Sequence, residues 1–171
     1  MKIQVVAYSN TWPAIYQNES EQISAILEDN LVAIHHIGST SVPGLQAKPI
    51  IDIMPVVRNI TAVDAHNNAF EKLGYECMGE FGMPGRRYFR KGSETRTHHI
   101  HIFEEANQVD ITRHLAVRDY LRSHQDVADA YGELKAKLAL EYPDDIDGYC
   151  DGKDAFVKEM EREAVRWRTN H

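Results

Sequence analysis

Residues 32–57 read VAIHHIGSTSVPGLQAKPIIDIMPVV, and this stretch does most to decide the fold. Its first part (32–37) predicts a short β-strand. Its last part (50–57) is apolar at nearly every position, which predicts a strand buried on both faces. The loop between them (38–49) is rich in Gly, Pro and hydroxyl residues, which are typical of turns. We therefore expect two strands joined by an irregular loop.

The sequence on either side predicts further strands and helices. Asn10, Thr11 and Pro13 are start signals for a helix with an apolar stripe, and a short strand candidate at 2–6 precedes it. The remaining predicted elements are a helix at 62–73, strands at 75–80, 86–91 and 97–103, and helices at 108–122, 124–141 and 152–168. The expected N-terminal caps of later helices are Thr61, Ser123 and Asp151. Strands mixed with helices, followed by a helical last third, predict an α/β or α+β domain.

The length of 171 residues and the composition fit one compact domain over residues 1–171. Hydrophobic residues make up 43% of the chain and charged residues 26%, which excludes disorder, a collagen-like repeat and a disulfide-rich miniprotein. The formal net charge of -7 argues against bulk nucleic acid as a partner, although it allows a local basic pocket.

The sequence also indicates the compartment. Cys77 and Cys150 show no metal or redox spacing, and the N-terminus MKIQVVAYSN has no signal-peptide core. No apolar run approaches the ~20 residues that a membrane span needs. We expect a soluble, cytoplasmic protein without a membrane partner.

The first candidate site is the loop that opens with Gly38, Ser39, Thr40 and Ser41. Small residues let a backbone turn tightly and approach a phosphate closely, and the hydroxyl groups add hydrogen-bond donors. Lys48, near the end of the loop, can add a positive charge. Any turn uses the same residue types, so this pattern by itself favours the alternative interpretation, a plain strand-to-helix turn.

The second candidate is Asp52, which lies inside the apolar strand at 50–57. An ionised carboxylate in such a strand costs several kcal/mol unless it is paired or bound to a cation. A metal ion, Lys48 or one of the arginines at positions 86, 87 and 90 would serve as this partner. A purely structural ion pair is the alternative interpretation.

The third candidate is the histidine-rich strand at 97–103. The period of two places His99 and His101 on one face and Ile100 and Ile102 on the other. Two imidazoles on one face can bind a metal, move protons or contact phosphate. The alternative is a half-exposed strand with two ordinary histidines.

The fourth candidate is the basic segment 86–91 (RRYFRK). Alternation along this strand separates Arg86, Tyr88 and Arg90 from Arg87, Phe89 and Lys91. Several cations on one short strand can focus a positive field, and arginine is well shaped for phosphate, so Arg87 and Arg90 are candidate phosphate ligands. A charged edge strand is the alternative.

These motifs make the chain closely similar to the GrpB family, bacterial proteins assigned to the nucleotidyltransferase superfamily that includes DNA polymerase beta. The similarity covers nearly the whole chain and is most specific over residues 36–53 (HIGSTSVPGLQAKPIIDI). The other matching positions are Tyr8, Trp12, Glu19, the paired histidines, residues 118–122 (RDYLR), Tyr131, Leu134, Lys135, Tyr149, Lys153 and Phe156.

The resemblance implies a small mixed sheet flanked by helices, in which the turn at Gly38 and Ser39 holds the phosphates of a nucleotide. It also implies two carboxylates, one residue apart on the next strand, and a third on a neighbouring strand. In the superfamily these carboxylates hold two magnesium ions. The two cations stabilise the attacking and leaving oxygens during transfer of a nucleotidyl group.

This chain departs from that pattern at the second and third carboxylates. Asp52 supplies one, but the positions two residues away are Ile50 and Met54, which cannot bind magnesium. The strand expected to supply the third acid carries His99 and His101 instead. Imidazole is a poor ligand for magnesium and a good one for zinc, nickel or iron, so a cluster of Asp52, His99 and His101 would change the metal preference. The alternative is that the catalytic apparatus is lost.

Two functional hypotheses follow. The first is a protein that binds a nucleotide, a coenzyme A precursor or another phosphorylated metabolite, without standard two-magnesium catalysis; relatives fused to dephospho-coenzyme A kinase suggest the coenzyme A precursor. The second is a nucleotidyl or phosphoryl transferase or a phosphohydrolase, in which Asp52, His99 and His101 are catalytic and bind a divalent metal (Mg, Mn or Zn). The sequence does not determine the oligomeric state.

Overall fold

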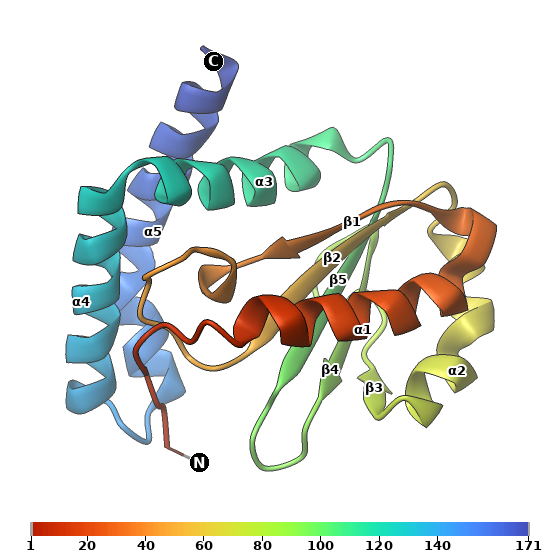
Figure 1. The fold of residues 1–171 in the computed structure, drawn as a ribbon, viewed down its shortest axis with the longest axis horizontal. Helices are drawn as coiled ribbons and strands as arrows, with labels where there is room; N and C mark the ends of the chain where they lie inside the picture. Colours follow the sequence, from red (N-terminus) through yellow and green to blue (C-terminus); the bar gives the residue numbers. More distant parts are fainter. Residues whose placement is uncertain (1, 171) are drawn as a thin grey trace. The chain divides into compact units, whose positions relative to one another are not determined.

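The computed structural model describes residues 2–170, whose arrangement is drawn in Figure 1. The elements in chain order, with η for a 3-10 helix, are α1 (Trp12–Leu27), η1 (Glu28–Asn30), β1 (Leu31–Ile37), η2 (Ser39–Ser41), β2 (Ile51–Val57), η3 (Thr61–His66), α2 (Asn67–Lys72), β3 (Tyr75–Cys77), β4 (Arg86–Lys91), β5 (His98–Glu104), α3 (Gln108–Ser123), α4 (Gln125–Glu141) and α5 (Ile146–Thr169). No helix within residues 2–170 has the length and apolar composition that crossing a membrane requires.

The described chain divides into two compact units. The sheet unit comprises residues 11–37 and 50–111, with α1, α2 and all five strands. The helical unit comprises residues 2–10, 38–49 and 112–170, with the loop after β1, most of α3, and helices α4 and α5. Each unit is described separately below.

The sheet unit is built on a mixed sheet with strand order β1-β2-β5-β4-β3. Strands β2 and β5 run parallel, and the other neighbouring strands run antiparallel. Every residue of β2 except Asp52 is buried, which confirms the prediction of a strand with two covered faces. Asp52 is therefore the one polar interruption in the strand.

Helices α1 and α2 pack on one face of this sheet (Figure 1). The strand register places side by side on that face His36, Ile53, Ile100 and Phe89. The ring of Phe70 in α2 stacks on Phe89 with centroids 4.4 Å apart, and Tyr16 in α1 stacks on His36 at 4.7 Å. Since side chains alternate along a strand, Asp52, His99 and His101 lie on the opposite face.

One buried charge links α1 to the edge of the sheet. Glu19 is 5% exposed, and its Oε1 accepts hydrogen bonds at 2.7 Å from the Tyr75 hydroxyl and at 2.7 Å from Lys91 Nζ. His98 Nε2 lies 4.0 Å from Glu19 Oε2. Burial raises the pKa of Glu19, but the hydrogen bonds from Lys91 and Tyr75 and the charges of Lys91 and His98 outweigh burial and lower the pKa.

The helical unit has its own apolar core. It consists of Val42, Leu45, Ala116, Tyr120, Leu121, Ala128, Tyr131, Met160 and Ala164. The loop 38–49 approaches α4 closely at Gly132, where a Cβ atom would lie 3.3 Å from Leu45 Cδ1. Glycine at this position therefore lets the loop pack directly on the helix.

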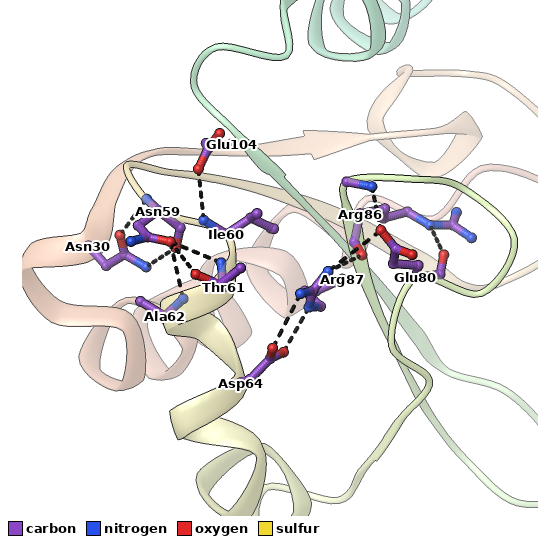
Figure 2. A network of polar contacts seen from close by, with 11 residues as sticks. Asn30, Asn59, Ile60, Thr61, Ala62, Asp64, Glu80, Arg86, Arg87 and Glu104 are labelled. Atoms are coloured by element: carbon purple, nitrogen blue, oxygen red, sulfur yellow. Dashed lines mark hydrogen bonds and ion pairs between the residues drawn. The ribbon is translucent and has the colours of Figure 1, made fainter.

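The structure corrects two local predictions near the sheet. Residues 2–6 do not form a strand, because Val6 makes only an isolated bridge to Ala47 while Ile3 N donates to the carbonyl of Pro143. Thr61 is not the cap of the following helix. The Asn59 Oδ1 atom accepts hydrogen bonds from the backbone N–H groups of Thr61 and Ala62 at 3.0 and 3.3 Å (Figure 2).

Two further corrections concern the C-terminal helices. Ser123 is the last residue of α3 and does not cap α4, which begins after His124. Helix α5 begins at Ile146, earlier than the predicted 152, because Asp145 rather than Asp151 provides the cap. The Asp145 Oδ1 atom accepts a hydrogen bond from Gly148 N at 3.0 Å.

Replacing Glu19 by Gln tests the buried charge. The substitution removes the negative charge that Lys91 faces, so we expect the free energy of unfolding at neutral pH to fall by roughly 1.5–3 kcal/mol, the usual range for hydrogen bonds to charged groups. The folded pKa of Glu19 lies below the unfolded value of 4.5. This ionisation therefore stabilises the fold fully above that value, and the contribution is lost as the pH falls through the folded pKa.

Urea denaturation of both proteins at neutral and at acid pH measures this effect. Glu21→Gln is the matched control, because Glu21 is exposed on the same helix, and we expect it to change stability by less than about 0.5 kcal/mol. A loss of the same size in both variants would contradict the assignment, as would a loss in Glu19→Gln that does not diminish in acid.

Candidate functional site

Strand pairing gathers Asp52, His99 and His101 on the sheet face opposite α1 and α2. In the parallel pair of β2 and β5, Asp52 lies directly opposite His99. His101 follows two residues later in β5 and points to the same side. The structure therefore brings together the three residues that the second functional hypothesis combined in one metal site. We call them the Asp-His-His cluster.

The geometry of the Asp-His-His cluster is close. Asp52 Oδ1 lies 3.1 Å from His101 Nε2 and 3.4 Å from His99 Nδ1. One ligand atom from each of the three residues lies within 4.8 Å of the others. Asp52 retains 25% side-chain exposure, against 23% for His99 and 15% for His101, so a small ligand can reach the cluster.

Asp52 is held in its ionised form. Burial raises the pKa of Asp52, but the hydrogen bonds with His101 and His99 and the charges of these rings outweigh burial. The pKa of Asp52 consequently lies well below its ordinary value. The partners of the carboxylate in the sheet unit are thus the two imidazoles, which the sequence analysis treated as a separate motif.

The two predicted phosphate-binding arginines of β4 are each paired with a carboxylate. Arg87 donates to both oxygens of Asp64, from Nε at 2.7 Å and from Nη2 at 3.2 Å (Figure 2). Arg90 Nη2 lies 3.1 Å from Glu76 Oε1. An anion at Arg87 or Arg90 would have to compete with these acids, and their role as phosphate ligands stays a prediction.

The donor set decides which metal the cluster can hold. The next residue of β2 on the same face, Met54, is fully buried and offers no oxygen. The pair of magnesium ions implied by the superfamily does not fit, because magnesium requires oxygen ligands and only Asp52 supplies them. One carboxylate and two imidazoles do fit zinc or another divalent transition metal.

The predicted phosphate loop lies in the helical unit and is tightly held. Gly38 has φ 73°, in the left-handed region that favours glycine, and its carbonyl accepts hydrogen bonds from Ser41 N at 3.1 Å and Ser41 Oγ at 2.5 Å. Lys135 Nζ in α4 donates to Ser39 Oγ at 2.7 Å, and Arg122 Nε in α3 donates to the Ser41 carbonyl at 2.9 Å. Two basic residues therefore hold the loop.

Lys48 lies at a second basic position in the helical unit. Its Nζ is 5.3 Å from the ring centroid of Tyr149, and Lys153 Nζ is 5.2 Å from the same centroid. Tyr149 is fully buried, and its hydroxyl has no hydrogen-bond partner among the residues that the structure describes. Thr40, the remaining candidate of the loop, is also buried. The phosphate-binding roles of Lys48 and Thr40 stay predictions.

The sequence analysis did not assign a role to Lys135, which is 3% exposed. A signal was present in the sequence, because Lys135 lies four residues after Tyr131 and three before Leu138, on the apolar stripe of α4. A lysine on a buried stripe needs a polar partner. The partner, Ser39, is distant in sequence and could not be inferred from the stripe.

Comparison with solved structures shows the class of fold. The structure of Cid1 poly(U) polymerase bound to MgATP matches with a TM-score of 0.51 at 11% identity, over 80% of this chain and 44% of that chain. At this identity the similarity concerns the fold alone. The mixed sheet with its C-terminal helices is a nucleotidyltransferase-like fold, as the family resemblance implied.

The family is established by sequence. The GrpB protein family matches residues 2–163. The UPF0157 protein YqkA of Bacillus subtilis is 44% identical over 167 residues, which cover 98% of this chain and 48% of YqkA. The crystal structure of the conserved protein GrpB from Enterococcus faecalis has 48% identity and a TM-score of 0.94, over 96% of this chain and 99% of that chain. The chain belongs to the GrpB family, and it spans about half the length of YqkA.

The donor set predicts metal selectivity. We expect the protein to bind zinc, measured by competition with a chromophoric chelator, and to show no comparable binding of magnesium. Asp52→Asn, His99→Ala and His101→Ala should each weaken zinc binding by more than about 10-fold, since even losses in the outer shell of a zinc site cost that much.

His66→Ala is the control for these variants, because His66 lies in η3 outside the Asp-His-His cluster. Its zinc affinity should equal that of the unaltered protein. Zinc binding that survives all three cluster substitutions would place the metal elsewhere.

Proposed function

We propose that this protein binds a nucleotide or another phosphorylated small molecule together with one divalent transition-metal ion at the Asp-His-His cluster. We further propose that it does so without the two-magnesium catalysis of the superfamily. The observation that carries the proposal is the cluster of one carboxylate and two imidazoles, with ligand atoms within 4.8 Å of one another.

The chemistry of the cluster supports a ligand in addition to the metal. Three protein ligands leave a coordination position open, which distinguishes catalytic and substrate-binding zinc sites from structural ones. A phosphate oxygen is a suitable occupant of such a position. Asp52 keeps its negative charge because its pKa is lowered, and this charge favours a cation over a proton.

The helical unit supports an anionic ligand. Lys48, Lys135 and Lys153 lie around the Gly38 loop and Tyr149, although the chain as a whole carries a net charge of -7. The Tyr149 hydroxyl, which has no hydrogen-bond partner within residues 2–170, is a further donor for an acceptor oxygen. Basic groups concentrated locally in an acidic protein favour a negatively charged small molecule over bulk nucleic acid.

The Asp-His-His cluster lacks the second and third carboxylates of the superfamily pattern. For this reason we propose ligand binding without the standard transfer reaction. Two magnesium ions stabilise the charge that develops on the phosphoryl group, and this is the largest catalytic contribution in such reactions. Asp52 is the sole carboxylate of the Asp-His-His cluster. The fold is retained, and the ligand set that supports two-metal transfer is not.

A second candidate function is metal-dependent nucleotidyl or phosphoryl transfer, or phosphohydrolysis. The observation that favours it is the contact of His101 Nε2 with Asp52 Oδ1 at 3.1 Å, because an imidazole held by a carboxylate is suited to move a proton. A bound zinc ion would supply Lewis-acid polarisation of a phosphoryl oxygen. In this case Asp52, His99 and His101 would be catalytic residues.

Calorimetric titration with and without metal tests the proposal. ATP, GTP and dephospho-coenzyme A are the probes, of which ATP is the nucleotide bound to Cid1 in the structure of similar fold. We expect at least one probe to bind more tightly by about 10-fold or more when zinc is present, and not when magnesium replaces it. Asp52→Asn should remove the gain from zinc.

The same solutions separate the two functions. Release of phosphate or pyrophosphate that requires zinc and is lost in Asp52→Asn would establish the second candidate. Binding without release supports the first. If zinc changes the affinity of no probe, in either the unaltered protein or Asp52→Asn, the Asp-His-His cluster has no role in ligand binding.

Lys135→Met tests whether the basic residues of the helical unit bind an anion. We expect it to weaken binding of inorganic phosphate at the loop of the helical unit by roughly 10-fold or more, with or without zinc, because a hydrogen bond from a charged donor near that loop is lost. Lys137→Met is the matched control on the same helix. Lys137 is 71% exposed and its Nζ lies 3.7 Å from Glu141 Oε1, so its loss should leave the dissociation constant unchanged. Equal effects of the two substitutions would exclude a specific role for Lys135.

A further inference from the structure

Phe81, in the turn between β3 and β4, has an unusually exposed side chain and a rare backbone conformation. It exposes 52% of its surface, although Phe is among the residue types most often buried. Its backbone has φ 48°, a left-handed conformation that is a genuine outlier for a bulky residue. Its ring stacks on Tyr88, with centroids 5.2 Å apart and 19° between the planes. A solvent-facing ring held in a strained backbone indicates a role other than core packing.

The turn that carries Phe81 is held in place by polar contacts. Arg86 Nη2 donates to the Phe81 carbonyl at 2.9 Å, and Arg86 Nε donates to the Glu80 carbonyl at 3.3 Å. Gly85 N donates to Glu80 Oε2 at 2.7 Å, and Figure 2 shows Arg86 and Glu80 meeting in this turn. A ligand that contacts the Phe81 ring would therefore meet a preordered surface and lose little entropy in ordering it.

Tyr88 lies between the Phe81 ring and the Asp-His-His cluster within the sheet unit. In the antiparallel pair of β4 and β5, Tyr88 lies opposite His101. The Tyr88 ring is 5.3 Å from the His101 ring and 5.6 Å from the His99 ring, measured between centroids. Only one aromatic ring separates Phe81 from the cluster.

Two guanidinium groups lie beside these aromatic rings, although Arg90 Nη2 also pairs with Glu76 Oε1 at 3.1 Å. Arg86 Cζ lies 4.8 Å from the Tyr88 centroid, and Arg90 Cζ lies 5.7 Å from the Phe81 centroid. The Arg90 Nε atom is buried without a hydrogen-bond partner among the described residues. Guanidinium groups stack on planar rings and also bind phosphate. Aromatic rings and guanidinium groups together suit a ligand that has both a planar ring and an anionic group.

We propose that the Phe81 ring is a stacking platform for the base of a nucleotide whose phosphates approach the Asp-His-His cluster. The inference rests on the proposed function, because it assigns the ring-bearing part of the same ligand. The Phe81 ring would bind the base by stacking, which tolerates different bases. The Arg90 guanidinium group lies beside the Phe81 ring. Phosphorylated molecules without a ring would not use Phe81.

Comparing a ligand with and without a base tests the platform. The probes are ATP and inorganic triphosphate, titrated by calorimetry into the zinc-loaded protein. We expect Phe81→Ala to weaken ATP by roughly 5- to 100-fold, the usual effect of losing an aromatic stack on one base, and to change triphosphate by less than about 2-fold. Phe81→Tyr should bind ATP as the unaltered protein does.

Leu140→Ala is the control for removal of an exposed apolar side chain, because Leu140 is 85% exposed in α4. It should leave both affinities unchanged, and circular dichroism establishes that each variant is folded. The platform would be overturned if Phe81→Ala left ATP binding unchanged or weakened ATP and triphosphate equally. It would also be overturned if the unaltered protein bound ATP no more tightly than triphosphate.

Failure of the proposed function has a different signature. If neither zinc nor triphosphate binds, saturation-transfer NMR with adenosine measures base stacking in the absence of metal. Contacts to adenosine that disappear in Phe81→Ala then support the platform by itself. Absence of such contacts in the unaltered protein overturns it.

Discussion

The hydrogen bonds between Asp52 and the imidazoles of His99 and His101 allow a carboxylate to remain in the most apolar strand of the protein. Without partners, such a group would be protonated or would destabilise the strand by several kcal/mol. The parallel pairing of β2 and β5 provides the partners, since it sets Asp52 opposite His99. The pairing of β2 with β5 therefore forms the sheet and also assembles the Asp-His-His cluster.

The same contact explains how a nucleotidyltransferase-like fold can carry different metal chemistry. In the superfamily pattern, oxygen ligands on neighbouring strands hold magnesium. Here the position on the neighbouring strand is occupied by imidazoles, at 3.1 and 3.4 Å from the single carboxylate. The backbone arrangement is kept while the donor atoms differ, and this donor set would favour a transition metal over magnesium.

The basic residues of this protein differ in their local surroundings. The net charge is negative, yet Lys135 is buried against Ser39, and Lys48 and Lys153 lie over the ring of Tyr149. In the sheet unit, by contrast, Arg87 and Arg90 are paired with acids. Basic residues that are equivalent in a composition count thus differ in their surroundings, because Arg87 and Arg90 pair with carboxylates while Lys135 donates to a hydroxyl group.

Alternation and residue type along the chain were sufficient to predict the five strands of the sheet, most helices and the shared face of His99 and His101, since these depend on neighbours a few residues apart. The family followed instead from a resemblance over nearly the whole chain, most specific at residues 36–53. Helix caps were less predictable, because Asn59 and Asp145 compete with Thr61 and Asp151 for the same role. Only the tertiary structure established the contact of Asp52 with the histidines, which the sequence analysis could state only as a hypothesis. It also paired Arg87 with Asp64, and Lys135 with Ser39 across 96 residues. These contacts depend on strand order and helix packing, which bring distant segments together and leave no periodic signal in the sequence.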